Sequence, residues 1–164
     1  MREMRGGDFL KNKFITLSPG KTNCYLIQAN SGYLLIDTGY EKDYSDFLKE
    51  LDAKKIKVKE INYLLLTHHH DDHSGFTNNL LKDTEVKIIA HKYAEDLLKT
   101  GENDKTIGGG YINKRVYYLS KIYKLLNPDW DLTFPPVKLS DTDILINDDN
   151  KEVLRKTGIN GTIL

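Results

Sequence analysis

The chain has 164 residues, a length typical of one domain, and its 24 Lys and Arg balance 24 Asp and Glu, so the formal net charge is zero. A neutral chain lacks the basic footprint of a general nucleic-acid binder, and no run of about 18 apolar residues provides a membrane span. The N-terminal segment lacks the apolar core of a secretory signal, and the single cysteine, Cys24, excludes a disulfide within the chain. We therefore expect a cytoplasmic protein with a small-molecule substrate and with no nucleic-acid or membrane partner.

The first part of the chain predicts three short strands. Runs of apolar and β-branched residues are separated by Ser-Pro-Gly at 18–20 and by Asn-Ser-Gly at 30–32, which are turn signals. The run at 33–36 is continuously apolar, as in a strand that is buried on both faces, and it ends at Asp37-Thr38-Gly39. The predicted strands span residues 14–17, 23–28 and 33–36.

Helices and strands then alternate along the chain. Tyr44, Phe47, Leu48 and Leu51 recur at intervals of three and four residues, which predicts an amphipathic helix over 42–56. A buried strand follows over 61–66. The pattern further predicts helices over 74–81, 93–99 and 112–126, and strands over 86–90, 144–146, 152–156 and 162–164. Residues 91–136 form a helical insertion region, and the mixture predicts a single α+β domain over 1–164 with helices outside its sheet.

One segment carries most of the chemical information. Four of the five histidines lie between positions 68 and 73, directly after the predicted buried strand. In an extended backbone, residues i and i+2 point the same way, so His68 and His70 can reach one metal ion while His69 points away. After a turn, Asp72 and His73 can face a neighbouring position. Imidazole and carboxylate are ligands for zinc, and also for iron or manganese.

The alternative for this segment is a His-rich tract without function, such as a tag remnant or a solvated loop. Tags lie at chain ends, whereas this tract follows a buried strand and places Asp72 next to His73. We therefore favour a metal site, in which each metal ion needs further ligands from elsewhere in the chain.

The residues around this segment resemble a known family. The pattern Thr-His-x-His-x-Asp-His, from Thr67 to His73, resembles the signature motif of the metallo-β-lactamase superfamily. The run NCYLIQANSGYLLIDTG at 23–39 resembles the family's opening hairpin and Asp-Thr-Gly turn, and LSDTDILI at 139–146 resembles a later turn and strand. The resemblance covers about residues 14–164. It implies an αββα sandwich of two sheets with helices outside.

The resemblance also implies a role for each site residue. His68 and His70 would bind the first metal ion, and Asp72 and His73 would bind the second. Asp72 would in addition position the attacking hydroxide, which makes it the candidate catalytic residue. Asp37 would orient the motif loop without binding metal. The alternative is that Asp37 caps a helix or a turn, because Thr38-Gly39 is also a common turn sequence. The implied cofactor is zinc, two ions in a complete domain, with iron or manganese as further options.

The chain departs from the family toward its C-terminus. The family supplies a third His to the first metal from a Gly-His turn, then a bridging Asp and a last His. Here the only histidine after residue 73 is His91, which we interpret as a strand-end surface residue. We therefore expect a sandwich that is incomplete at the C-terminus, in which residues 139–164 provide only the beginning of the second sheet.

The resemblance implies a metal-dependent hydrolase in which a metal-bound hydroxide attacks a carbonyl. Because Asp72 and His73 occur together, the chain resembles the thioester hydrolases and hydroxyacylglutathione hydrolases of the family more than its secreted β-lactamases. The alternative is a truncated, catalytically incompetent remnant that binds metal weakly or not at all. A redox di-iron protein of the same fold is disfavoured because His68 and His70 are both present.

Two further expectations follow from an incomplete domain. Zinc in catalytic sites usually has three protein ligands, and the motif offers two to each metal ion, so we expect little hydrolase activity from the 164-residue chain alone. An inner sheet face made of Leu34, Ile36, Leu64 and Leu66 would need a covering layer. We therefore expect a marginally stable chain, a homodimer through that face or through an open sheet edge, or a longer C-terminal part.

Overall fold

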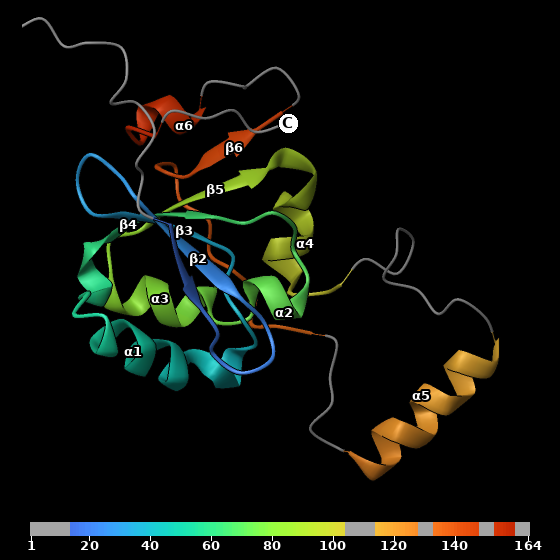
Figure 1. Ribbon diagram of the computed structural model, residues 1–164. Coiled ribbons are helices and arrows are strands. Elements are labelled where there is room, and N and C mark those ends of the chain that lie inside the picture. Colours follow the sequence, from blue (N-terminus) through green and yellow to red (C-terminus); the bar gives the residue numbers. More distant parts are fainter. Residues whose placement is uncertain (1–13, 104–113, 128–132, 148–152, 160–164) are drawn as a thin grey trace, which may run out of the picture.

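One six-stranded sheet organises the chain, in the spatial order β1-β2-β3-β4-β5-β6 (Figure 1). The computed structural model describes residues 14–103, 114–127, 133–147 and 153–159. The strands are β1 (Phe14–Leu17), β2 (Cys24–Gln28), β3 (Tyr33–Ile36), β4 (Ile61–Leu65), β5 (Lys87–His91) and β6 (Ile144–Ile146). These confirm six of the predicted strands with shifts of one residue or less at each end. The mixed α+β class is confirmed as well.

The sheet changes from antiparallel to parallel at β3. Strands β1, β2 and β3 pair antiparallel, whereas β3, β4, β5 and β6 pair parallel. Strand β6 lies beside β5, with Ile89 opposite Ile144, so residues 144–146 extend the first sheet instead of beginning a second one. The carboxylate of Asp143 explains this placement, because it accepts hydrogen bonds from the backbone N–H of Ile88 and of Ser140, both at 2.7 Å.

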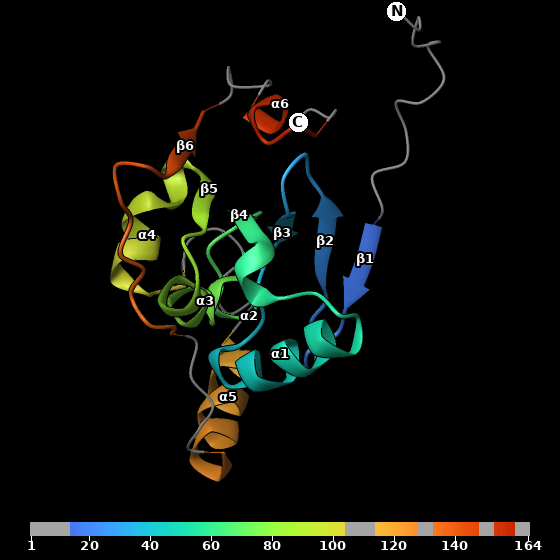
Figure 2. The same ribbon diagram turned by 90° about the vertical axis from the view of Figure 1, so that its left-hand side faces the viewer.

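Helices cover one face of this sheet (Figure 2). Helix α1 (Tyr44–Ala53) follows a 3₁₀ turn at Glu41–Asp43 and buries Phe47 and Leu51. Helix α3 (Thr77–Asp83) buries Leu80, and α4 (Glu95–Thr100), which follows a 3₁₀ turn at Lys92–Ala94, buries Leu98. A further 3₁₀ turn at Val58–Glu60 leads into β4. The predicted helices over 42–56, 74–81 and 93–99 are thus confirmed, the second of them divided between α2 (Asp71–Ser74) and α3.

The opposite face of the sheet has a separate and smaller apolar cluster. Leu34 and Ile89 are its fully buried strand residues, and Ile36, Tyr63 and Leu65 pack against them. Leu64 and Leu66 belong instead to the helix-covered core, so the prediction that they share a face with Leu34 and Ile36 is wrong. The cause is the parallel register, which pairs Leu35 with Leu64 and Ile36 with Leu65.

A short helix, α6 (Val153–Lys156), lies on this second face where the sequence predicted a strand over 152–156. Val153 is buried there, and Gly158, with φ +79°, ends the turn as the backbone N–H of Ile159 donates to Leu154 O. A glycine in this conformation is a common helix C-terminal signal, which the strand prediction overlooked. The strand predicted over 162–164 lies outside the described residues.

Helix α5 (Lys114–Leu126) differs from the other described α-helices because none of its residues is buried. It lies apart from the sheet in Figure 1 and confirms the helix predicted over 112–126 for the residues that the structure describes. Among the described residues, no helix has both the length and the apolar character needed to cross a membrane.

Candidate metal centre

The predicted ligand segment lies at the edge of the sheet where the parallel strands β3 and β4 end. Ile36 pairs with Leu65, and the backbone N–H of Asp37 donates to Leu65 O at 2.9 Å. Parallel pairing therefore places Asp37 beside Thr67, although 30 residues separate them in the chain. Loops at strand ends are where a rigid sheet can hold reactive side chains.

Asp37 connects the two loops at this edge. Its carboxylate accepts hydrogen bonds from the backbone N–H of Thr67 at 2.8 Å, from Thr67 Oγ1 at 2.7 Å and from His73 Nδ1 at 3.0 Å. The residue is buried and has φ +56°, a left-handed conformation that is uncommon outside glycine. Asp37 thus contacts the motif loop at both of its ends, and its supporting role in a metal-loaded site remains a prediction.

A tight turn redirects the chain after His70. The backbone N–H groups of His73 and Ser74 and the Ser74 hydroxyl all donate to His70 O, which forms the short helix α2. Thr38 holds this helix against the end of β3, because its backbone N–H and hydroxyl donate to His73 O at 2.7 and 2.8 Å. A Cβ atom at Gly75 would lie 2.5 Å from Asp71 O and 2.6 Å from Glu41 N, so only glycine fits there.

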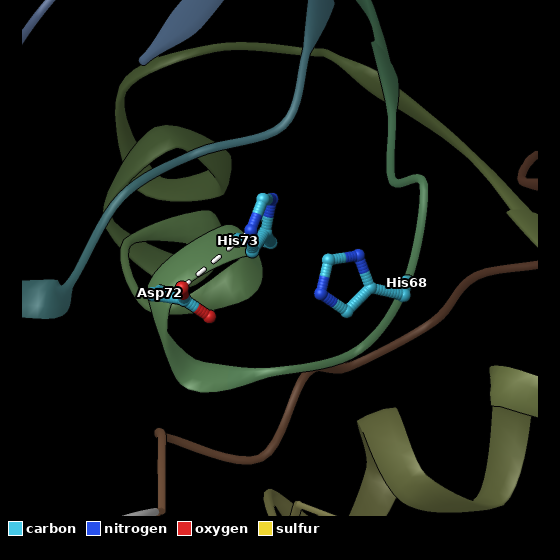
Figure 3. Close-up of side chains that lie close together, drawn as sticks. All are labelled: His68, Asp72 and His73. Carbon is cyan, nitrogen blue, oxygen red and sulfur yellow. Dashed lines mark ion pairs between the residues drawn. The ribbon is translucent and has the colours of Figure 1, made fainter. Parts of the chain in front are cut away.

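The turn brings three candidate ligands together. Donor atoms of His68, Asp72 and His73 all lie within 4.8 Å of one another, and Figure 3 shows these side chains around a common space. His73 Nε2 lies 3.5 Å from Asp72 Oδ2, and the ring centroids of His68 and His73 are 4.0 Å apart. His68 comes from the loop after β4, whereas Asp72 and His73 come from α2.

His70 lies next to this group but is not part of it. Its ring centroid is 4.8 Å from that of His68 and 4.9 Å from that of His69. The structure therefore brings together His68, Asp72 and His73, which the family resemblance divides between two metal ions. The assignment of His68 with His70 to one ion, and of Asp72 with His73 to another, stays a prediction. His91 is half-buried at the end of β5 and lies outside the group.

Hydrogen bonds select the nitrogen of His68 that can bind a metal. The Thr67 hydroxyl has one proton, and it lies 2.7 Å from the Asp37 carboxylate, which can only accept. The hydroxyl oxygen must then accept the hydrogen bond from His68 Nδ1, at 3.0 Å. Nδ1 of His68 consequently carries the proton, which leaves the lone pair on Nε2.

The two histidines of the group have opposite electrostatic surroundings. The hydrogen bond from His73 to Asp37 raises the pKa of His73, and the charges of Asp37, Asp72 and Asp71 act in the same direction, against partial burial. Partial burial lowers the pKa of His68, and the neighbouring His73 and His70 lower it further, outweighing Asp37 and Asp72. Two imidazoles and a carboxylate, with His73 Nδ1 held by Asp37, are a donor set that suits zinc.

Comparison with known proteins shows the family of this chain. The sequence model of the metallo-beta-lactamase superfamily matches residues 17–162. The chain belongs to this superfamily. The thioesterase pkgB of Emericella nidulans is 32% identical over 110 residues, which cover 58% of this chain and 30% of that protein. A hydroxyacylglutathione hydrolase of Methylobacillus flagellatus is 32% identical over 66 residues, covering 40% of this chain and 24% of that protein.

Solved structures of the superfamily share this fold. The subclass B3 metallo-beta-lactamase BJP-1 of Bradyrhizobium japonicum superposes with a TM-score of 0.57 at 23% identity, over 78% of this chain and 40% of that chain. The chain thus spans less than half the length of these relatives. The αββα sandwich expected from the sequence is the fold of these neighbours, and the described residues of this chain contribute one sheet with its helices.

Proposed function

We propose that this chain provides part of the metal centre of a hydrolase that cleaves a thioester or a similar activated carbonyl compound. The observation that carries the proposal is the convergence of His68, Asp72 and His73 at the end of β4, with Asp37 behind His73. The substrate class is supported by two relatives, one named as a thioesterase and one as a hydroxyacylglutathione hydrolase.

Each residue has a defined part in this proposal. His68 would bind through Nε2, the nitrogen that its contact with Thr67 leaves unprotonated. His73 would bind through its own Nε2, because Asp37 holds the proton on Nδ1 and so fixes the orientation of the ring. Asp72 would bind through one oxygen and orient the attacking water with the carboxylate. A bound zinc ion would supply Lewis acidity and lower the pKa of a water to about 7.

We further propose zinc as the metal, with two ions in a complete site that also uses His70. Iron and manganese accept the same ligands, so elemental analysis of the purified chain should be done without prior metal loading and again after it. A small-molecule substrate and a cytoplasmic location remain proposals of the same kind.

The second candidate is a chain that folds but does not catalyse. It is favoured by one observation: among the described residues, His68, Asp72 and His73 bring donor atoms together for one metal ion, whereas the complete site has two. This candidate predicts weak metal binding and no turnover, whatever the substrate.

One experiment separates the two candidates. The chain, and a longer chain where the gene continues, are loaded with Zn²⁺ and assayed with acyl thioesters before and after addition of a chelator. Chelator-sensitive hydrolysis that is lost in His68→Ala and Asp72→Ala, and kept in the matched control His69→Ala, supports the hydrolase. Metal binding that is equally strong in all three variants would exclude the proposed ligands.

A further inference from the structure

Asn103 links the ligand loop to a distant part of the chain. Its side-chain Oδ1 accepts a hydrogen bond from the backbone N–H of Asp71 at 3.0 Å, and its Nδ2 donates to Asp71 Oδ1 at 2.8 Å. Asp71 is the first residue of α2 and lies between His70 and Asp72. Both hydrogen bonds therefore act on the point where the chain turns from one candidate ligand to the next.

Asp71 needs both of these hydrogen bonds. Its side chain is buried, and a buried carboxylate without a donor is strongly unfavourable. The first N–H groups of a helix have no acceptor within the helix, and α2 has only four residues, so few internal hydrogen bonds hold it. An amide side chain satisfies the carboxylate and the N–H together, which neither a carboxylate nor a hydrocarbon side chain in its place could do.

Asn103 is itself firmly placed. Helix α4 ends at Thr100 and is followed by Gly101, whose φ is +72°. Gly101 O accepts a hydrogen bond from the backbone N–H of Phe134 at 3.0 Å. Glu102 forms an antiparallel bridge with Thr133, and Val137 N–H donates to Leu98 O. Residues 101–103 and 133–137 thus form a stem, with Phe134 and Val137 buried against the helix-covered core.

From this arrangement we propose that Asn103 is a positioning residue for the metal centre. It binds no metal, but it holds the α2 turn so that Asp72 and His73 face His68. The inference rests on the proposed metal site. Because the stem also bounds the stretch of chain that contains α5, the pair Asn103–Asp71 connects that stretch to the ligand loop.

The test exchanges the two side chains. In Asn103→Asp, the amide that donates to Asp71 is lost, and two carboxyl groups face each other across the former hydrogen bond. In the double variant Asp71→Asn/Asn103→Asp, the new carboxylate accepts from the N–H of residue 71 and from the new amide, so both hydrogen bonds return with the same total charge. Affinity for Zn²⁺ by calorimetry and the visible absorption of the Co²⁺-loaded chain are the two readouts.

Because Asn103→Asp adds a carboxylate, an electrostatic effect and a positioning effect predict opposite changes in metal affinity. An additional carboxylate near the site would strengthen cation binding if only electrostatics mattered, whereas a positioning role predicts that Asn103→Asp weakens it. We expect a loss of about tenfold in metal affinity for Asn103→Asp and for Asn103→Ala, in the range seen when groups behind a metal ligand are removed. The double variant should return to near the wild-type affinity and spectrum. Tighter binding in Asn103→Asp, or a double variant as weak as the single one, would overturn the inference.

A matched control and a second measurement complete the design. Asn78 donates two hydrogen bonds to the same stem, at Pro135 O and Pro136 O, and these side-chain hydrogen bonds do not involve the ligand loop. Asn78→Ala should leave metal affinity unchanged, and an equal loss in both alanine variants would reduce Asn103 to a general structural role.

If the wild-type chain takes up no metal, the proposed function fails by itself. Amide hydrogen exchange at His73 and Ser74, faster in Asn103→Ala and not in Asn78→Ala, then still decides whether the pair holds the turn.

Discussion

The two faces of the sheet bury unequal amounts of apolar surface. The helix-covered face buries the side chains of α1, α3 and α4 against every strand from β1 to β5. The opposite face has a smaller cluster, in which Ile36, Tyr63 and Leu65 remain partly exposed and α6 is the only described helix. Burial of apolar area is the main source of stability, so the helix-covered face should contribute most of the free energy of unfolding.

The expectation that the open face or edge forms a homodimer stays a prediction, which sedimentation velocity of the chain can test.

Two adjacent leucines in β4 test this comparison most directly. Leu64 is fully buried on the helix-covered face, and Leu65 is partly buried on the opposite one. Leu64→Ala should reduce the free energy of unfolding by about 3 kcal/mol, because it leaves a cavity in a closed core, whereas Leu65→Ala should cost about 1 kcal/mol. Urea unfolding of both variants measures the difference. Equal losses would mean that the second face is covered as completely as the first.

Gly75 tests the point where the helix-covered face meets the ligand loop. A Cβ atom there would clash with backbone atoms of Asp71, Glu41 and Gly39, none of which can move like a side chain. We expect Gly75→Ala to cost about 2 kcal/mol and to weaken metal binding together with stability. The neighbouring change Ser74→Ala removes one hydrogen bond to His70 O and should cost about 1 kcal/mol. A neutral Gly75→Ala would show that the loop is not packed as closely as these distances indicate.

How much of this could be predicted depends on the range of the interactions involved. The strands, most helices and the ligand motif follow from local patterns such as the apolar run at 33–36 and the histidines at 68–73. The face of each β4 leucine does not, because both faces of a doubly buried strand are apolar and only the register with β3 distinguishes them. The role of Asn103 cannot be predicted from a local sequence pattern either, because it depends on a hydrogen bond with Asp71, 32 positions earlier.

Cys24 offers a chemical comparison of the two faces. Burial raises the pKa of its thiol to about 12, and the charges of Asp37, Glu50 and Asp43 add to this effect. The native thiol should therefore not react with a disulfide reagent at about pH 8, and it should react fully in urea. A new thiol on the opposite face, in Leu65→Cys with Cys24→Ala, should react faster in the native state. Equal protection of the two positions would contradict the comparison.

The same raised pKa makes a prediction about alkaline stability. A thiol whose pKa is higher in the folded state keeps its stabilising contribution below the unfolded pKa near 9.0, and that contribution is lost as the pH rises toward about 12. Stability of the wild-type chain should fall more steeply over this window than stability of Cys24→Ala. Unfolding at a series of pH values measures the two slopes, and parallel slopes would show that Cys24 ionises equally in both states.

The smallest effect is expected in α5, which belongs to neither face. Leu125 is 80% exposed, whereas Leu98 in α4 is fully buried in the helix-covered core. Replacing an exposed leucine removes little buried area, so Leu125→Lys should change the free energy of unfolding by less than about 0.5 kcal/mol. Leu98→Lys would bury a charge without a partner and should prevent stable folding. A clear loss of stability in Leu125→Lys would show that α5 packs against apolar surface in solution, and unfolding at several protein concentrations would then tell a contact within one chain from a contact between two.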